Sequence, residues 1–288
     1  MRLPKPARYR IEYAGFCLAE AGARALPLES ASWLSGKLWR LIASRLYRHK
    51  RALANLALAY PDMTPEDREK LATRMWENLG RTFAESFRLP DIVEGGRILF
   101  EPKERLDAMA AHGACVMCSL HMGNWEIGGA VGQRIGKPLA GVYQRVSNPF
   151  VEAEIRRLRL PYYQGGLLPK TPVTARALMK AVNAGSSPVF LADLRDDRGV
   201  EAPFFGHPAR SNVFPALLAR VMGVPLYAAA AFRKPDVRFT IRIEPVPIPH
   251  TNDRDADAAA ATEKLQSQFE AFIREAPEQW MWAHRRWD

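Results

Sequence analysis

The sequence predicts an α/β fold: a mixed, largely parallel sheet flanked by helices and preceded by an N-terminal helical segment. From residue 97 onward, short apolar runs bounded by turn residues alternate with amphipathic stretches, a pattern typical of a sheet covered by helices. Before that point the apolar residues recur only at helical spacing. We therefore expect a helical segment over 1–96 and an α/β core over 97–288, integrated with each other because no long linker separates them.

The N-terminal segment is expected to be helical over about 11–60, with apolar stripes beside many Arg and Lys residues. Ordinary core packing accounts for such stripes, but the concentration of Trp, Tyr and Arg is equally typical of a helix lying on a membrane surface. Pro61 ends this block. A second helix is expected from Thr64 to Phe87, with Thr64 as the N-cap and Pro65 in the first helical position.

In the predicted core, strands alternate with helices. Predicted strands cover 114–120, 139–143, 188–192, 226–232 and 238–243, and predicted helices cover 149–160, 171–185, 212–222 and 253–276. The first four strands are mainly apolar and the fifth alternates polar with apolar residues, as a half-exposed strand does. Residues 277–288 form an aromatic and cationic tail.

The charge balance favours anionic partners. The 288 residues contain 41 Lys and Arg against 31 Asp and Glu, a formal net charge of +10. Such a surface suits nucleic acid, an acidic carrier protein or anionic lipids, and composition does not choose among them. Three cysteines are too few for a disulfide framework, which favours a reducing compartment. We expect neither a secretory signal nor a membrane-spanning helix, which needs about 20 apolar residues.

The stretch 120–129 carries the candidate chemistry. It follows the first predicted strand, and its Gly123-Asn124 turn leads into a helix, so His121 lies at the strand's carboxyl end, where open α/β sheets bind ligands. The spacing to Glu126 allows the carboxylate to return beside the imidazole as the orienting partner of a general base. The alternative is an unremarkable edge histidine with a solvated glutamate, and spacing alone does not decide between them.

A zinc site is the competing interpretation of the same region. His112, Cys115, Cys118 and His121 are evenly spaced, but successive side chains of a strand alternate faces, so the two cysteines point to opposite sides of the sheet. Because the ligands of structural zinc must converge on one point, two buried core cysteines are favoured and no metal is expected.

The absence of other catalytic motifs argues against several enzyme classes, and a few further residues are candidates for the site. The sequence has no Gly-x-Ser-x-Gly elbow, Walker loop or dinucleotide glycine fingerprint, which disfavours the corresponding hydrolases, NTPases and oxidoreductases. Asp193 ends a predicted strand, as His121 does, so both are candidates for one sheet edge. The basic run 156–159 is either a charged helix face or an anion site. The apolar connection 202–209 either walls a lipid-sized groove or folds back on the core.

Several further motifs are spread over nearly the whole chain. They are Arg51-x3-Asn55-Leu56, Tyr60-Pro61, His121-Met-Gly-Asn-Trp-Glu126, Val142-Tyr143-x-Arg145, Asn148-Pro149, Arg157-Leu-Arg159, Ala192-Asp193, Pro203-Phe-Phe-Gly206 and the tail Pro277-Glu-Gln-Trp-Met-Trp-Ala-His-Arg-Arg-Trp287. With these motifs the sequence resembles the late lipid A acyltransferases, the lauroyl and myristoyl transferases of lipopolysaccharide assembly. That family belongs to the glycerolipid acyltransferase superfamily, whose signature is His-x4-Asp/Glu. Its members commonly carry an N-terminal transmembrane anchor, for which this sequence has no candidate.

The resemblance implies transfer of a fatty acyl chain, from acyl carrier protein or acyl-CoA, to a hydroxyl of an anionic glycolipid, foremost a lipid A precursor. It implies a peripheral or monotopic protein on the cytoplasmic face of the inner membrane that needs no cofactor. His121 is the implied general base and Glu126 its orienting partner. Backbone N–H groups of the Gly123-Asn124 turn or an arginine would stabilise the oxyanion. The residues implied to contact substrate are Asn124, Arg145, Arg157, Arg159, Asp193, Phe204 and Phe205, the arginines holding phosphate and the phenylalanines lining the acyl groove.

Two alternatives stay open. The acceptor is alternatively a lysophospholipid or another membrane lipid. In a different class, a basic non-catalytic protein would bind membrane or nucleic acid, with the aromatic residues of the tail 280–287 stacking on bases. No recognisable nucleic-acid-binding module supports that alternative, so no nucleic acid partner is expected.

Overall fold

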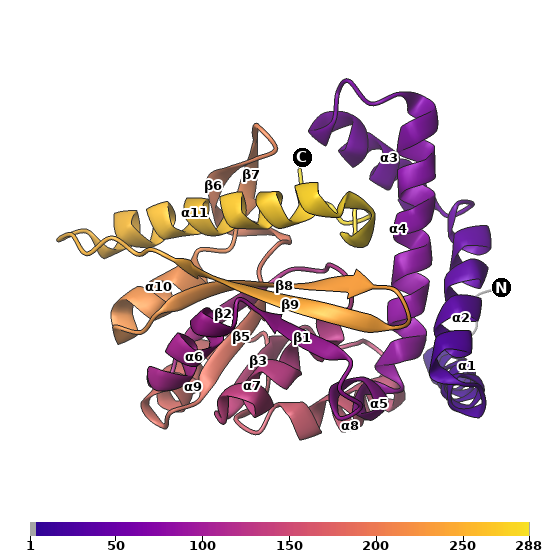
Figure 1. Ribbon diagram of the computed structural model, residues 1–288, viewed down its shortest axis with the longest axis horizontal. Helices are drawn as coiled ribbons and strands as arrows, with labels where there is room; N and C mark the ends of the chain where they lie inside the picture. The colour runs from indigo at the N-terminus through magenta and orange to yellow at the C-terminus, as the bar shows by residue number, and fades with distance from the viewer. Residues whose placement is uncertain (1–3, 288) are drawn as a thin grey trace.

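The computed structural model describes residues 4–287 and shows an α/β core with a helical N-terminal segment along one end (Figure 1). A seven-stranded sheet has the order β1-β9-β8-β2-β5-β3-β4. Its strands are β1 (Ile98–Glu101), β2 (Val116–Ser119), β3 (Leu139–Tyr143), β4 (Gly166–Pro169), β5 (Ser187–Leu191), β8 (Leu226–Lys234) and β9 (Arg238–Val246). Within this sheet only β8 and β9 pair antiparallel, which confirms the predicted mixed, largely parallel fold class.

Helices cover both faces of this sheet (Figure 1). In the core they are α6 (Lys103–Ala111), η1 (Trp125–Gly129), α7 (Ala130–Ile135), α8 (Pro149–Arg159), η2 (Leu160–Tyr162), α9 (Thr174–Asn183), α10 (Phe214–Met222), α11 (Arg254–Glu275) and η3 (Pro277–Gln279). Apolar residues of α9, α10 and α11 pack on one face, and those of α6 and α7 pack on the other.

The N-terminal segment is divided into α1 (Lys5–Ala25), α2 (Leu28–Ala43), α3 (Tyr47–Ala59), α4 (Pro65–Ser86) and the short α5 (Leu89–Val93). The start of α4 agrees with the prediction, because the Thr64 side chain accepts a hydrogen bond from the Asp67 amide at 3.1 Å. Within the described residues, no helix is both long and apolar enough to cross a bilayer.

The N-terminal helices and the sheet share one buried cluster. Leu56 of α3 and Trp76 of α4 belong to the same cluster as Phe232 of β8 and Trp282 of the tail. Helix α4 also contacts η1 and η3, so this long helix lies directly behind the stretch that was expected to carry the chemistry.

The alternation of side chains along β2 separates the two cysteines. Cys118 belongs to the cluster on the α10 face, whereas Cys115 belongs to the cluster on the α6 face. Both thiols are free and buried, and burial raises the pKa of Cys115 to about 11. Among the described residues, no group of His, Cys, Asp and Glu is arranged to hold a metal ion.

The connection 202–209 is not a loop. It belongs to the hairpin of β6 (Arg195–Phe204) and β7 (His207–Ser211), which pair antiparallel apart from the seven-stranded sheet. The hairpin turns at Phe205 and Gly206, both of which have positive φ. Its two phenylalanines fold back on the core, where Phe204 contacts Trp280 and Phe205 contacts Trp282.

Candidate active site

His121 and Asp193 are brought together by two adjacent parallel strands. Ser119 of β2 is paired with Leu191 of β5, so the residues that follow each strand emerge at the same edge of the sheet. The imidazole Nδ1 lies 2.9 Å from Asp193 Oδ1, and the His121 backbone N–H donates to Oδ2 at 2.9 Å. Trp280 donates its indole N–H to the same Oδ2 at 2.8 Å. The carboxylate thus fixes the ring, and Nε2 is the nitrogen left for chemistry.

The Asp193 carboxylate is fully buried and held in its charged form. Burial alone would raise its pKa, but the charge of His121 and the hydrogen bonds from that residue outweigh burial. The pKa of Asp193 therefore lies well below its ordinary value. A buried carboxylate on Nδ1 stabilises the imidazolium that forms when Nε2 takes a proton.

Glu126 has a different partner from the one expected. Its carboxylate forms a bidentate pair with Arg159 at the end of α8: Nε donates to Oε2 at 2.7 Å and Nη2 donates to Oε1. Trp125 donates its indole N–H to Oε1 at 3.0 Å. The hydrogen bond that orients His121 comes from Asp193 instead, because the turn after β2 directs the Glu126 carboxylate toward α8.

Glu126 and Arg159 each stabilise the charged form of the other. Burial would raise the pKa of Glu126, but Arg159 outweighs it and the pKa is lowered. Burial would lower the pKa of Arg159, but Glu126 raises it above the ordinary value. Both groups are therefore charged at the edge of the cleft described below.

The turn before η1 is set by buried contacts. Gly123 has a φ of 58°, and a Cβ there would lie 1.7 Å from the carbonyl oxygen of Ala231, so only glycine fits beneath β8. Asn124 caps η1 by accepting from the Glu126 amide at 3.1 Å. Its Nδ2 donates at 2.9 Å to Glu85 of α4, which is fully buried. Helix α4 thereby positions the first turn of η1.

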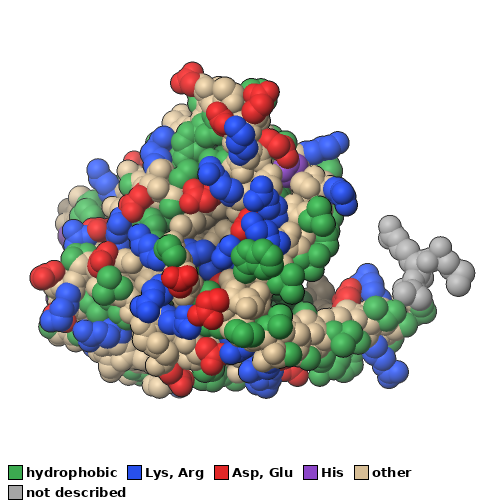
Figure 2. All heavy atoms as spheres, turned by 45° about the vertical axis from the view of Figure 1, so that its right-hand side comes forward, with side chains coloured by type: hydrophobic (Ala, Val, Ile, Leu, Met, Phe, Trp, Pro, Cys, Tyr) green, Lys and Arg blue, Asp and Glu red, His purple; other side chains and the backbone are tan. Residues whose placement is uncertain are grey.

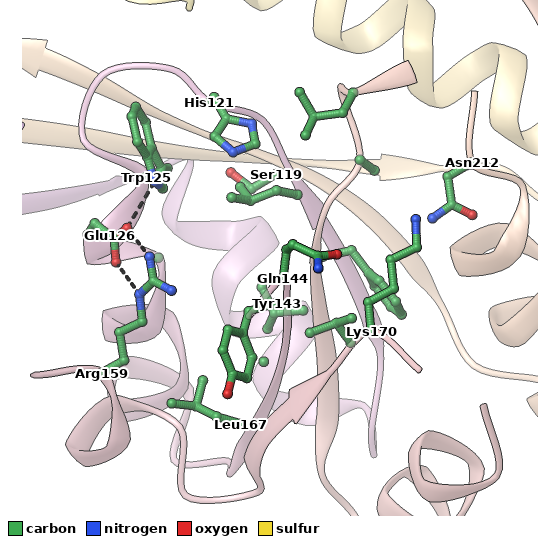
Figure 3. A pocket seen from close by; sticks show the side chains of 18 of the residues that line it. Ser119, His121, Trp125, Glu126, Tyr143, Gln144, Arg159, Leu167, Lys170 and Asn212 are labelled. Carbon is green, nitrogen blue, oxygen red and sulfur yellow. Dashed lines mark hydrogen bonds and ion pairs between the residues drawn. The ribbon is translucent and has the colours of Figure 1, made fainter. Parts of the chain in front are cut away.

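A cleft of about 520 Å³ opens at this edge of the sheet (Figure 3). Trp125, Glu126 and Arg159 lie on one side of it and Lys170 and Asn212 on the other, with the His121 ring above them (Figure 3). Its lining also includes Ser119, Tyr143, Gln144, Met281 and His284.

A smaller apolar pocket of about 170 Å³ adjoins the cleft. The two share Trp125, Glu126 and Arg159, so the ion pair lies between them. The apolar walls come from helices α1, α4 and α8 and include Phe16, Leu79, Phe83, Phe87, Ile155 and Leu158.

The C-terminal tail completes the site. The Met281 amide donates to the carbonyl of His121 at 3.0 Å, and the Gly123 amide donates to the carbonyl of Gln279 at 3.0 Å. The ring of His284 packs edge to face against the His121 ring, 4.8 Å between centroids. Burial, reinforced by the neighbouring His121, lowers the pKa of His284 to about 4, so this second imidazole is neutral.

The whole-chain match decides what kind of protein carries this site. Residues 5–288 match the family model of the bacterial lipid A biosynthesis acyltransferases. The chain belongs to this family. It is also similar to the lipid A biosynthesis lauroyltransferase of Escherichia coli (strain K12), with 26% identity over 259 residues that cover 83% of this chain and 78% of the relative. Both comparisons support acyltransferase activity.

In this acyltransferase family member, the residues expected to bind substrate are distributed over several environments. Arg159 lines the cleft. Arg157 lies on the outside of α8, paired with Glu20 of α1 and with Glu154, and it ties two helices together. Arg145 is exposed beside Gln144, outside the cleft lining.

The other residues expected to contact substrate are buried. Asn124 is buried as a helix cap, and Asp193 orients His121 from beneath. Phe204 and Phe205 do not line the cleft, because both are buried against the tryptophans of the tail. Their apolar character reflects core packing.

Sequence reasoning missed Trp280 and His284, whose side chains contact Asp193 and His121. Two signals point to this tail: its density of aromatic and cationic residues, which equally suits stacking on bases, and its place among the motifs of the family resemblance. Nothing in the sequence indicated that a segment 87 positions after Asp193 would return to the edge of the sheet.

Proposed function

We propose that this protein transfers a fatty acyl chain from a thioester donor, acyl carrier protein or acyl-CoA, to a hydroxyl of an anionic glycolipid, with a lipid A precursor as acceptor. The observation that carries the proposal is the pairing of His121 with the buried Asp193: the imidazole lines the cleft, with one nitrogen fixed by the carboxylate and the other available. Membership of the acyltransferase family supports the same reaction class.

The reaction needs one proton acceptor that later returns the proton. As the acceptor oxygen attacks the thioester carbonyl carbon, His121 Nε2 takes the hydroxyl proton, and Asp193 stabilises the imidazolium without being protonated. The carbon–sulfur bond of the tetrahedral intermediate then breaks, and His121 gives its proton to the departing thiolate. General base catalysis of this kind contributes about 10²–10⁴-fold.

Arg159 is the proposed oxyanion donor. The amide of Gly123, an expected candidate, already donates to the carbonyl of Gln279. Arg159 lines the cleft with its guanidinium held by Glu126, so a fixed positive charge faces the region where the thioester oxygen becomes negative. In this proposal Glu126 acts by positioning Arg159 and not by orienting the imidazole.

The apolar pocket between α1, α4 and α8 is the proposed site of the acyl chain. Because it shares Trp125, Glu126 and Arg159 with the cleft, a chain lying in it leads its carbonyl toward Arg159 and His121. Apolar walls favour a hydrocarbon chain, and the polar side chains of the cleft suit the thioester and the acceptor headgroup. This pocket replaces Phe204 and Phe205 as the acyl groove.

The outer surface of α2 supports binding of the protein to a membrane surface. Its small residues, among them Ala31, Ser32 and Gly36, face inward against α4. Its large apolar residues face outward and are about half exposed: Trp33, Leu34, Leu38, Leu41 and Ile42. A helix in water reverses this arrangement, so the outward face suits the acyl boundary of a bilayer.

Figure 2 shows one face with Lys and Arg side chains around a hollow and hydrophobic side chains on the arm that leads to the N-terminal end. Helix α1 contributes the exposed Leu18 and also Phe16, which lines the acyl pocket. We propose that the protein lies on the cytoplasmic face of the inner membrane with α1 and α2 in contact with lipid.

Mass spectrometry of total lipids from cells with and without the protein tests this function. We expect a phosphorylated glycolipid to lose the mass of one acyl chain when the protein is removed. A change confined to lysophospholipids would assign the acceptor to that alternative class. An unchanged lipid profile would contradict acyl transfer.

A further inference from the structure

Two sequence motifs from opposite ends of the chain meet beside the catalytic cleft. Asn55 of α3 donates hydrogen bonds from Nδ2 to the carbonyls of Trp282 and His284, both at 2.7 Å. These partners are 227 and 229 positions away in the sequence. A buried amide with two short hydrogen bonds fixes α3 against the tail, so the residues one and two turns before Asn55 have a defined place on the face that meets the tail.

Arg48 and Arg51 occupy that place. They are three positions apart and therefore lie on one side of α3. With Asn55 they lie on the face of α3 that is held against the carbonyl of His284. Burial lowers the pKa of His284, and the positive charges of both arginines add to this effect. His284 in turn lines the cleft and contacts the ring of His121. Two cations thus lie on the face of α3 that is docked beside His284.

These arginines differ from the cations of the opposite wall. Lys170 pairs with Asp196 at 3.3 Å across the cleft edge. Within residues 4–287, by contrast, neither Arg48 nor Arg51 has a carboxylate at ion-pair distance, and Arg51 lies only over the ring of the exposed Tyr47. Arg48 is exposed and Arg51 is half-buried, so both can reach a ligand.

The start of α3 adds to the excess of positive charge. The helix has no acidic residue in its first turn, and its N-cap residue, Leu46, provides no side-chain hydrogen bond. Cations in the first turn oppose the helix dipole, whereas an anion there is stabilised by the dipole and by free backbone N–H groups. His284 has a buried Nε2 without a hydrogen-bond partner among the described groups. Glu69 pairs with His49 in the first turn of α3, and the charge of Asp193 acts on His284, but no carboxylate within residues 4–287 lies at ion-pair distance from Arg48 or Arg51.

We propose that Arg48 and Arg51, with His284 at the inner end, form a phosphate-binding site beside His121. Planar guanidinium groups bind phosphate oxygens through paired charge-assisted hydrogen bonds. The inference rests on the proposed acyl transfer for its biological ligand, a phosphate ester on the acceptor headgroup or on the pantetheine arm of the carrier. It replaces Arg145 and Arg157 as the phosphate-holding residues.

Binding is tested first without any acyl transfer. Histidine ring resonances of the full-length protein are followed by NMR while inorganic phosphate is added at constant ionic strength, with chloride as the reference anion. We expect saturable shifts of the His284 signal and an affinity that falls about tenfold or more in the Arg48→Gln/Arg51→Gln variant. Lys50→Gln removes the same charge from the neighbouring helix position and is expected to bind phosphate as the wild type does.

Steady-state kinetics then identify the source of the phosphate. If the acceptor supplies it, the double variant raises KM about tenfold for a phosphorylated acceptor and leaves KM unchanged for the dephosphorylated one. If the carrier supplies it, the KM for the acyl carrier protein donor rises instead. In both cases kcat stays within a few-fold of the wild type.

The site is overturned if phosphate leaves the His284 signal unchanged in the wild type, or if Lys50→Gln weakens binding as much as the double variant does. Phosphate binding without any acyl transfer would instead refute the proposed function and leave the site standing. The two failures are therefore distinguishable.

Discussion

Asp193 accepts hydrogen bonds from the imidazole and the amide of His121 and from Trp280. We expect Asp193→Asn to lower kcat by about 10²–10⁴-fold, because an amide neither fixes the required tautomer nor stabilises the imidazolium. Turnover of the purified variant measures this, with circular dichroism as the check on folding. A folded variant with a kcat within a few-fold of the wild type would show that His121 does not depend on Asp193.

The same residue makes stability depend on pH. The pKa of Asp193 in the folded protein lies below its ordinary value of 3.8, so its contribution is complete above that value and is lost as the pH falls toward the folded pKa. We expect Asp193→Asn to be less stable than the wild type at neutral pH and the difference to shrink below pH 3.8. Urea unfolding across this range measures it, and a pH-independent difference would be inconsistent with the linkage.

Glu126 and Arg159 are expected to act as a unit. Arg159→Lys loses the bidentate geometry, and Glu126→Gln leaves the guanidinium unanchored, so each should lower kcat by about 10²–10³-fold. Because each substitution breaks the same pair, the double variant should be hardly worse than either single one. Fully additive losses in the measured rates would mean that the two residues serve separate functions.

The sequence predicts where the site residues lie along the strands better than it predicts which side chains they pair with. His121 and Asp193 were each expected at the end of a strand on one sheet edge, and both lie there. Their pairing depends on β2 and β5 being neighbours, which no spacing rule states for residues 72 positions apart. Glu126 was assigned to His121 because it is near in sequence, but the end of α8 supplies a closer and oppositely charged partner.

At the scale of elements, the outward face of α2 leads to a prediction about membrane binding. Leu34 and Leu38 are each about half exposed, so replacing both with Asn removes apolar area that lipid would cover. We expect Leu34→Asn/Leu38→Asn to weaken binding to anionic vesicles about tenfold or more in a flotation assay. Val173→Asn is the control, because Val173 is exposed before α9, far from α2 (Figure 1). Equal binding by all three proteins would contradict contact through α2.

The sequence predicts the central strands and the long helices, but not β1 and β4, the strands at the two edges of the sheet. The β3 strand has the predicted bounds, and α4 lies within one residue of them at each end. The strands β1 and β4 have four residues each, too few to show a period. The sequence predicts a loop in place of the β6–β7 hairpin, because Pro203, Gly206 and Pro208 interrupt its apolar residues.

At the scale of the whole molecule, the site is assembled from distant parts of the chain. The sheet edge supplies His121 and Asp193, α8 supplies Arg159, and the tail supplies Trp280. Helix α4 contributes Glu85, whose hydrogen bond to Asn124 supports η1 from behind. The sheet was predictable from its strands one by one, whereas this assembly depends on long-range packing that one sequence does not reveal.

The central claim is that His121 is the general base of a transfer from a thioester to a glycolipid hydroxyl. Mass spectrometry of a reconstituted reaction tests it most directly, with purified protein, acyl-loaded carrier protein and a lipid A precursor in mixed micelles. We expect the precursor to gain one acyl group with the wild-type protein and the rate to fall at least about 10²-fold with His121→Ala. Absence of acylated product with the wild type, or near-normal turnover by a folded His121→Ala variant, would contradict the claim.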